Sequence, residues 1–343
     1  MSSWIQRVGA LFGGRSVAAV VAAPRARNRS AALPRLRAAV PAATPPSDAD
    51  CSGFGESMIL DPQLPFFEWL LDTSASLDAP LLPNEQRLLA RLDAVLAADA
   101  SRAELLPRAP AVIPQLMNSL RGESQSVQAL AGRVAKDPNL VAEVIRMANS
   151  TLARAAEPVS DLPQAIGRLG TLGLRRAIAK VVLKPIFDAQ PDSLSGRAAP
   201  RLWLHSEAKA ADCMRLATAA GLDPFEGYLA GLMHNIGWTA ALRALDRAGE
   251  VEGRAKAQAP PQFSRAFVQA FETRREMFFA MLVMPWQLTD SLTALAVELL
   301  DGGLKASRSP LGQALLAADR NASLDLLGAG ALLDSMTLAT PRA

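Results

Sequence analysis

Residues 224–242 read PFEGYLAGLMHNIGWTAAL, and this stretch decides the fold class. From Gly227 to Leu242 it carries no charged side chain, which predicts a helix that is buried on all sides. At 100° per residue, large apolar residues share one face, whereas glycines, alanines and His234 collect on the other. Small residues let a neighbouring helix approach closely or leave a hollow, and a buried imidazole needs hydrogen-bond partners. We therefore expect a helical core with His234 inside it.

The composition of the whole chain also favours helices. Half of the 343 residues are hydrophobic, alanine and leucine dominate, and Tyr228 is the only tyrosine. Alanine and leucine lose little on entering a helix, whereas strands draw on β-branched and aromatic residues. No stretch shows a convincing alternation of period two, and we find no tandem repeat. An all-α fold is therefore predicted.

Helix starts are marked most clearly by two Asp-Pro pairs, Asp137-Pro138 and Asp223-Pro224. Each places a capping acid before a proline at the first helical position. Asn84 is a further candidate cap, for a helix with an apolar side formed mainly by leucines. The later helices are expected at 163–169, 172–188, 200–219, 224–247, 263–282 and 286–300, with two short helices within 301–343.

These elements suggest four parts. Residues 1–55 are predicted to be a disordered basic arm rich in arginine, alanine and proline, and 56–107 a helical N-terminal extension. Residues 108–300 form the main domain, and 301–343 a C-terminal helical extension. The arm contains one stretch of helical spacing that begins at Trp4, with two interpretations: a weak anchor at an anionic membrane surface or a docking peptide, and an unstructured terminus.

The positive charge belongs to the arm rather than to the main domain. Seven of the 36 basic residues are arginines within residues 1–46, where no acidic residue occurs, which leaves 29 basic against 33 acidic residues. The remainder therefore has a net charge of about −4, without the basic face of a nucleic-acid-binding domain. We expect no nucleic-acid partner and no transmembrane segment. The two cysteines, Cys51 and Cys213, support neither a disulfide framework nor a zinc ribbon and fit a cytoplasmic location.

Six segments, in order along the chain, resemble the HDOD family, a relative of the HD phosphohydrolases. They are Pro110 to Leu116, Ala135-Lys136-Asp137-Pro138-Asn139-Leu140, Val144-Ile145-Arg146-Met147-Ala148-Asn149-Ser150, Ala165-Ile166-Gly167-Arg168-Leu169-Gly170, Leu202-Trp203-Leu204-His205-Ser206 and Ala230-Gly231-Leu232-Met233-His234-Asn235-Ile236-Gly237. The resemblance covers more than half of the chain. It implies an HD-domain-like bundle of helices and a role in bacterial signal transduction, usually without demonstrated catalysis.

The resemblance also implies where a metal site would be. His205 matches the first histidine position of HD enzymes and His234 the histidine of their His-Asp pair, but Asn235 replaces the aspartate. The chain has only two histidines, so the later histidines of active relatives are absent. We expect His205 and His234 to approach one another, with no third or fourth strong ligand beside them.

The number of ligands argues against catalysis. Two neutral imidazoles and an amide supply no negative charge to neutralise a divalent cation. A distant carboxylate such as Asp212 or Asp290 could complete a site, although no spacing singles either out. We expect no enzyme activity, no metal and no cofactor. His234 is then either a hydrogen-bonded core residue or part of a small-ligand pocket with His205 and Asn235, and His205 on the first interpretation is partly solvated.

Other residues of the resembling segments have structural explanations. Asn149 and Ser150 suit the end of a helix, and Asn149 a fixed hydrogen bond between helices. Asp137 and Pro138 begin a helix. Gly170 and Gly237 also match the family motif, and we assign them a structural role.

Three functions follow from these observations. The first is a non-enzymatic regulator that binds other signalling proteins through its helical surfaces. The second is a metal-dependent phosphohydrolase or cyclic-dinucleotide phosphodiesterase with a remodelled site. The third is a nucleotide sensor without turnover.

Overall fold

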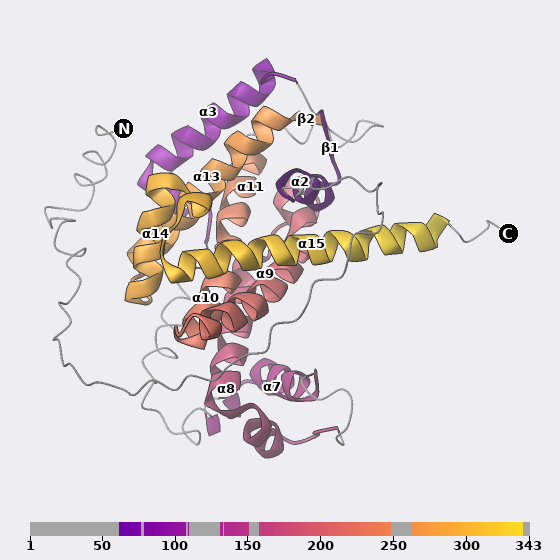
Figure 1. Ribbon diagram of the computed structural model, residues 1–343, viewed down its shortest axis with the longest axis vertical. Helices are drawn as coiled ribbons and strands as arrows, with labels where there is room; N and C mark the ends of the chain where they lie inside the picture. Colours follow the sequence, from indigo (N-terminus) through magenta and orange to yellow (C-terminus); the bar gives the residue numbers. More distant parts are fainter. Residues whose placement is uncertain are drawn as a thin grey trace, which may run out of the picture. The chain divides into compact units, whose positions relative to one another are not determined.

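The computed structural model describes residues 62–76, 79–107, 109, 131–132, 134–150, 158–247 and 262–338. In this part of the chain almost all regular structure is helical, which confirms the all-α class (Figure 1). The basic arm and its two interpretations lie outside the described residues. Among the described helices, none combines the length and the apolar character needed to cross a bilayer.

The N-terminal extension contributes α2 (Gln63–Leu71), α3 (Pro83–Ala97) and α4 (Asp99–Ala103). The leucines predicted for one side of α3 are buried. The cap, however, is at Leu82 rather than at Asn84, because the Leu82 backbone N–H donates to Glu85 Oε2 at 2.8 Å. Glu85 is itself buried and accepts from the Ser264 backbone N–H at 2.7 Å, which ties the extension to the later part of the chain.

The middle of the chain forms α7 (Pro138–Ser150), α8 (Leu162–Phe187), α9 (Leu194–Ala219), α10 (Pro224–His234) and α11 (Ile236–Arg247). Both Asp-Pro starts are confirmed. Asp137 Oδ1 accepts from the Asn139 backbone N–H and Asp223 Oδ1 from that of Phe225, each at 2.9 Å. The prolines occupy the first positions of α7 and α10.

Two breaks shape these helices. The helix expected over 224–247 is in fact two helices, because the backbone turns at Asn235, where φ is −72° and ψ is −1°. The break expected between 169 and 172 is present at Gly170, within α8. There φ is 62° and ψ is −169°, a conformation open essentially to glycine alone.

The C-terminal part begins with β2 (Gln262–Ser264) and continues through helices. They are α13 (Arg265–Val283), the 3-10 helix η2 (Met284–Trp286), α14 (Asp290–Gly302), the 3-10 helix η3 (Leu304–Ala306) and α15 (Pro310–Leu338). The expectation of two short terminal helices was wrong. Pro310 begins one long helix, and no further proline occurs before Pro341 to end it.

A short parallel ladder, which the sequence did not predict, joins β1 (Ser74–Ser76) to β2. Strands of three residues are too short to show alternation of period two. The ladder holds the segment after α2 beside the start of α13, with Ala75 opposite Phe263.

Small residues let α9 and α13 approach the broken helix closely. A Cβ added at Gly231 would lie 2.6 Å from the Ala210 Cα on α9, and one added at Gly237 would lie 2.1 Å from the Arg275 carbonyl oxygen on α13. The predicted face of small residues therefore serves close packing. It brings side chains of α9 and α13 against His234 from two directions.

Candidate functional site

His205, His234 and Asn235 meet in one buried network. His205 lies on α9, His234 ends α10, and Asn235 forms the joint to α11. The Asn235 Nδ2 lies 3.1 Å from His205 Nδ1. The side chains belong to residues that are 1 %, 0 % and 0 % exposed, so the interpretation of His205 as partly solvated was wrong. The structure brings together the three residues that the resemblance indicated.

The centre of this network is the ammonium group of Lys209, one turn after His205 on α9. Its Nζ donates to Asn235 Oδ1 and to Asp319 Oδ1, each at 2.7 Å, and lies 3.1 Å from His234 Nδ1. Lys209 is fully buried, and burial lowers the pKa of its ammonium, whereas the charge of Asp319 and the hydrogen bond to it favour the charged form. A positive charge supplied by the protein itself therefore occupies the point between His234, Asn235 and Asp319.

Asn235 fits this position because it donates as well as accepts. Its Nδ2 is within hydrogen-bonding distance of the Leu202 carbonyl oxygen at 3.0 Å, His205 Nδ1 at 3.1 Å and Ser206 Oγ at 2.9 Å, while its Oδ1 accepts from Lys209. An ionised carboxylate has no proton to donate to those groups. The hydrogen bonds around this position therefore require an amide, which an aspartate could not replace.

Asp319, on α15, is the acidic partner of Lys209. Burial alone would raise the pKa of its carboxyl, but the charges of Lys209 and Arg275 and a hydrogen bond with His234 hold that pKa well below its ordinary value. The carboxylate oxygen Oδ1 lies 3.6 Å from His234 Nδ1 and 3.9 Å from His205 Nε2. Asp319, which was not predicted from the sequence, therefore lies near both histidines.

Arg275, on α13, adds a second buried cation. Its Nε donates to Glu272 Oε2 at 2.6 Å, and its Nη2 lies 3.7 Å from Asp319 Oδ2. Burial opposes the charge of Arg275, but Glu272, Asp319 and Glu276 hold its pKa above the usual value. Burial raises the pKa of Glu272 to about 7 against the pull of Arg275. The guanidinium also lies over the Trp238 ring, 5.5 Å from its centroid.

Both histidines are held neutral. Burial, followed by the charge of Lys209, lowers the pKa of His205 and of His234 to about 3. His234 lies between two donors, with Lys209 Nζ at Nδ1 and Arg275 Nη1 at 3.4 Å from Nε2. A neutral imidazole accepts at only one nitrogen, so only one of these two cations can donate a hydrogen bond to the ring.

A divalent metal does not fit these residues. Among the described residues, no group of three histidine, cysteine, aspartate or glutamate side chains is arranged to hold a metal ion. The position that His234, Asn235 and Asp319 surround belongs to the Lys209 ammonium, and Arg275 adds a second cation beside it. Asp212 lies outside this group of side chains: it pairs with Arg215 at 2.6 Å and accepts from Asn321 Nδ2, on α15, at 2.8 Å.

Helix α2 covers the network from the side of His205. The Phe66 ring lies 4.3 Å from the His205 ring, centroid to centroid, and also contacts Trp238. Arg201, on α9, fixes the end of α2 by donating to the Trp69 carbonyl oxygen at 2.7 Å. The N-terminal extension therefore forms part of the wall of the site.

A comparison with known protein families identifies the family to which this helical domain belongs. A family model described as HDOD domain matches residues 106–298, more than half of the chain. The chain belongs to the HDOD family. Lys209, His234 and Arg275 lie within the matched HDOD segment, whereas Phe66 and Asp319 lie outside it.

Individual relatives are distant. One, from Treponema pallidum (strain Nichols) and described as "Uncharacterized protein", is 18% identical over 173 residues, which are 50% of this chain and 33% of that protein. The chain thus matches about a third of that relative's length. Among solved structures, one from Shewanella amazonensis SB2B, called "Putative metal-dependent phosphohydrolase", has a TM-score of 0.50 at 19% identity, covering 69% of this chain and 82% of that chain. An HDOD domain protein of unknown function from Geobacter sulfurreducens has a TM-score of 0.49 at 22% identity, covering 71% and 80%.

The other motif residues of the HDOD segment have structural contacts. Asn149 closes a pair of hydrogen bonds with the backbone of Val159, donating to its carbonyl oxygen at 3.0 Å and accepting from its N–H at 2.8 Å. Ser150 ends α7, with its Oγ donating to the Met147 carbonyl oxygen at 2.9 Å. These contacts agree with the structural interpretation of both residues.

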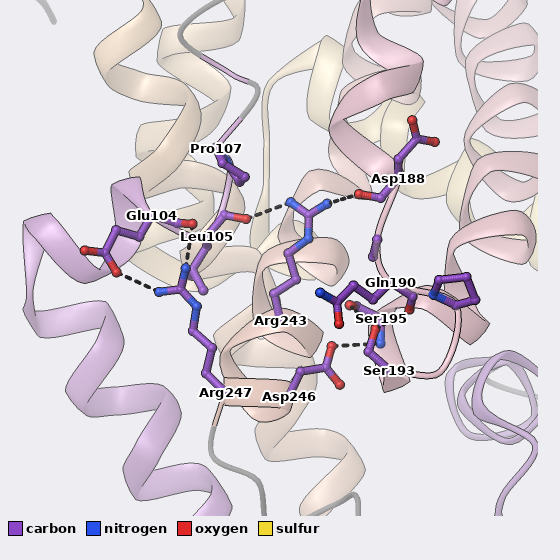
Figure 2. A pocket seen from close by; sticks show the side chains of 12 residues that line it. Glu104, Leu105, Pro107, Asp188, Gln190, Ser193, Ser195, Arg243, Asp246 and Arg247 are labelled. Carbon is purple, nitrogen blue, oxygen red and sulfur yellow. Dashed lines mark hydrogen bonds and ion pairs between the residues drawn. The ribbon is translucent and has the colours of Figure 1, made fainter.

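Two cavities of the HDOD segment and its extension lie away from the histidines. The larger, of about 600 Å³, is lined by the end of the N-terminal extension, the segment between α8 and α9, and α11 (Figure 2). In Figure 2 two arginines of α11 reach across it: Arg243 donates to the carbonyl oxygens of Leu105 and Asp188, each at 2.7 Å, and Arg247 pairs with Glu104 at 2.9 Å. The smaller, of about 380 Å³, lies between α7 and α8.

Sequence reasoning missed three charged members of the network, and only one had a local signal. Lys209 follows His205 by four residues and so lies on the same face of α9. Asp319 is 110 residues from Lys209, and Arg275 is 41 residues from His234. Nothing in the local sequence around Asp319 or Arg275 indicates that they reach the histidines.

Proposed function

We propose that this HDOD protein is a non-enzymatic regulator in bacterial signalling, which acts in the cytoplasm by binding other proteins. The observation that carries the proposal is the Lys209 ammonium between His234, Asn235 and Asp319. A hydrolytic metal site must attract a dication and leave a position open for water. A buried cation at that point repels the metal, and Lys209 is a fixed part of α9.

A second candidate is a metal-dependent phosphohydrolase or cyclic-dinucleotide phosphodiesterase. What favours it is the name of one similar solved structure, the "Putative metal-dependent phosphohydrolase" from Shewanella amazonensis SB2B. On this alternative, Lys209 would have to leave the centre, and Asp319 would join the two histidines as a ligand. The two candidates therefore differ in whether a metal binds at all.

Metal analysis separates the candidates. The purified chain, dialysed against Mn²⁺, Fe²⁺ or Mg²⁺ and then freed of excess ion, is expected to retain far less than one metal per chain. It is also expected not to hydrolyse cyclic dinucleotides or phosphomonoesters. Metal near stoichiometry that is lost in His234→Ala but kept in Asp212→Ala, together with turnover, would establish the enzyme instead. Asp212→Ala is the matched control, because it removes a carboxylate whose partners are Arg215 and Asn321 rather than the residues around Lys209.

Protein binding needs its own test. Crosslinking in living cells, followed by affinity capture of the tagged chain, should return the same few partners from independent cultures. A helical surface variant that keeps the unfolding midpoint but loses these partners should also lose the signalling output. If no partner recurs and deletion of the gene leaves signalling outputs unchanged, the regulatory proposal is wrong.

A further inference from the structure

The environment of the Asp319 carboxylate is that of a bound anion. Its Oδ1 accepts from Lys209 Nζ at 2.7 Å and lies within 4 Å of a ring nitrogen of each histidine, and its Oδ2 lies 3.7 Å from Arg275 Nη2. Helices α9, α10 and α13 thus bring cationic groups or ring nitrogens close to one carboxylate. α15 contributes the carboxylate itself.

This carboxylate is also the member of the network nearest to solvent. The Asp319 side chain is 19% exposed, whereas those of Lys209, His234 and Arg275 are 0–3% exposed. An anion from solution would therefore reach the two buried cations through the position that Asp319 now fills. Lys209 depends on that position, because among the ion pairs of the described residues its only acidic partner is Asp319.

α15 packs on α9, and several of its buried side chains near Asp319 are small. Its residues Ala314, Ala318 and Ala322 are buried, and Ser323 Oγ lies 3.1 Å from His205 Nε2. Leu315 of the same helix is also fully buried, and Asn321 Nδ2 donates to Asp212 Oδ2 on α9 at 2.8 Å. The ion pair with Lys209 is therefore one of several contacts that hold this stretch of the helix. Beyond Ser323, Leu324 and Asp325 are exposed.

We propose that the space filled by the Asp319 carboxylate is a binding site for a small oxyanion of the carboxylate type, which the chain occupies itself while α15 is docked. The ligand would bind Lys209 and Arg275 in place of Asp319 and would displace α15 from α9. This inference rests on the proposed function, because the anion is bound and not hydrolysed. Binding of the anion would then regulate the protein by changing the position of α15.

Chemical rescue tests the site in the full chain. Asp319→Ala removes the carboxylate and leaves space beside Lys209, so sodium formate should stabilise this variant at constant ionic strength. We expect a saturable rise in the unfolding midpoint of roughly 2 °C when formate is at ten times its dissociation constant. Acetate should act more weakly because of its methyl group, and chloride should produce no saturable rise.

Three controls keep the test specific. Asp319→Asn fills the same space with a neutral amide and should not respond to formate, and Asp325→Ala removes an exposed carboxylate of the same helix and should behave like the wild type. In the Lys209→Gln, Asp319→Ala double variant the rescue should disappear. If Asp319→Ala is recovered only unfolded, the yield of refolding in formate against chloride replaces the melting curve.

The opposite results are equally clear. Equal responses to formate and chloride, or a response of Asp319→Asn as large as that of Asp319→Ala, would overturn the oxyanion site. Neither result bears on metal content or hydrolysis, so the failure of this inference is distinguishable from the failure of the proposed function.

Discussion

Two regions of the molecule hold cations in opposite ways. In the network around Lys209, the partners of the charge are side chains from α10, the α10–α11 joint and α15, and the lysine is 0% exposed. In the cavity of Figure 2, the Arg243 guanidinium binds main-chain carbonyls, and Arg247, with a side chain 46% exposed, pairs with Glu104 at 68%.

The two regions differ in how well water can solvate the remaining charge when one partner of an ion pair is removed. Water can reach Glu104 and solvate it once Arg247 is gone, so little is lost. Water reaches Asp319 only in part and the groups behind it not at all, so an unpaired charge there stays poorly solvated. The network around His205 and His234 is thus buried, and its charged side chains stabilise one another. The ion pair of Glu104 and Arg247 in the cavity of Figure 2 is instead exposed to solvent.

The largest effect is expected from Lys209→Met. This change keeps the length of the side chain but leaves Asp319 beside neutral groups and Arg275. Breaking a buried ion pair by removing one partner costs about 3–5 kcal/mol of unfolding free energy. Urea denaturation of Lys209→Met against Lys184→Met, an exposed lysine of α8, measures the difference.

A double variant sharpens this prediction. Lys209→Met combined with Asp319→Leu removes both charges, so it should be more stable than Lys209→Met alone, with strong non-additivity. If Lys209→Met loses no more stability than Lys184→Met, the ammonium is not the centre of the network.

Acid should weaken the closed region before the rest of the protein. The histidines have a folded pKa of about 3, so between pH 6.5 and 3 the unfolded chain binds two protons that the folded chain does not. Their contribution to stability is present above pH 6.5 and is lost as the pH falls toward 3. Glu272, with a pKa of about 7, takes up a proton in the folded state and opposes the loss, and the raised pKa of Glu276 acts in the same direction.

The opposing contributions of the histidines and Glu272 predict how the unfolding free energy changes with pH. From pH 6.5 to pH 5 we expect a net loss of roughly 1–2 kcal/mol of unfolding free energy. Glu272→Gln cannot take up the opposing proton, so urea denaturation of this variant should show about twice the loss over the same range. A wild-type stability that stays constant or rises as the pH falls would contradict neutral, buried histidines.

The features that the sequence predicts are those formed by residues close to one another in the chain. The Asp-Pro caps, the break near Gly170 and the uncharged stretch around His234 are local, and the structure confirms them. The pairing of His205, His234 and Asn235 came from the family resemblance. Asp319 and Arg275 enter through tertiary packing alone. The single helix predicted over 224–247 failed for a similar reason, because the turn at Asn235 lies within a run whose pattern of buried residues continues unbroken.

The smallest effect is expected in the open cavity, from the exposed pair of Glu104 and Arg247. A double-mutant cycle with Glu104→Ala and Arg247→Ala should give a coupling energy of about 0.2–1 kcal/mol that falls as salt is added, since both side chains are largely solvated. Arg243→Ala is the internal reference, because it deprives three main-chain carbonyls of a donor and should cost more than Arg247→Ala. A coupling energy for Glu104 and Arg247 as large as that for Lys209 and Asp319 would remove the distinction, because the two regions would then hold their charges equally tightly.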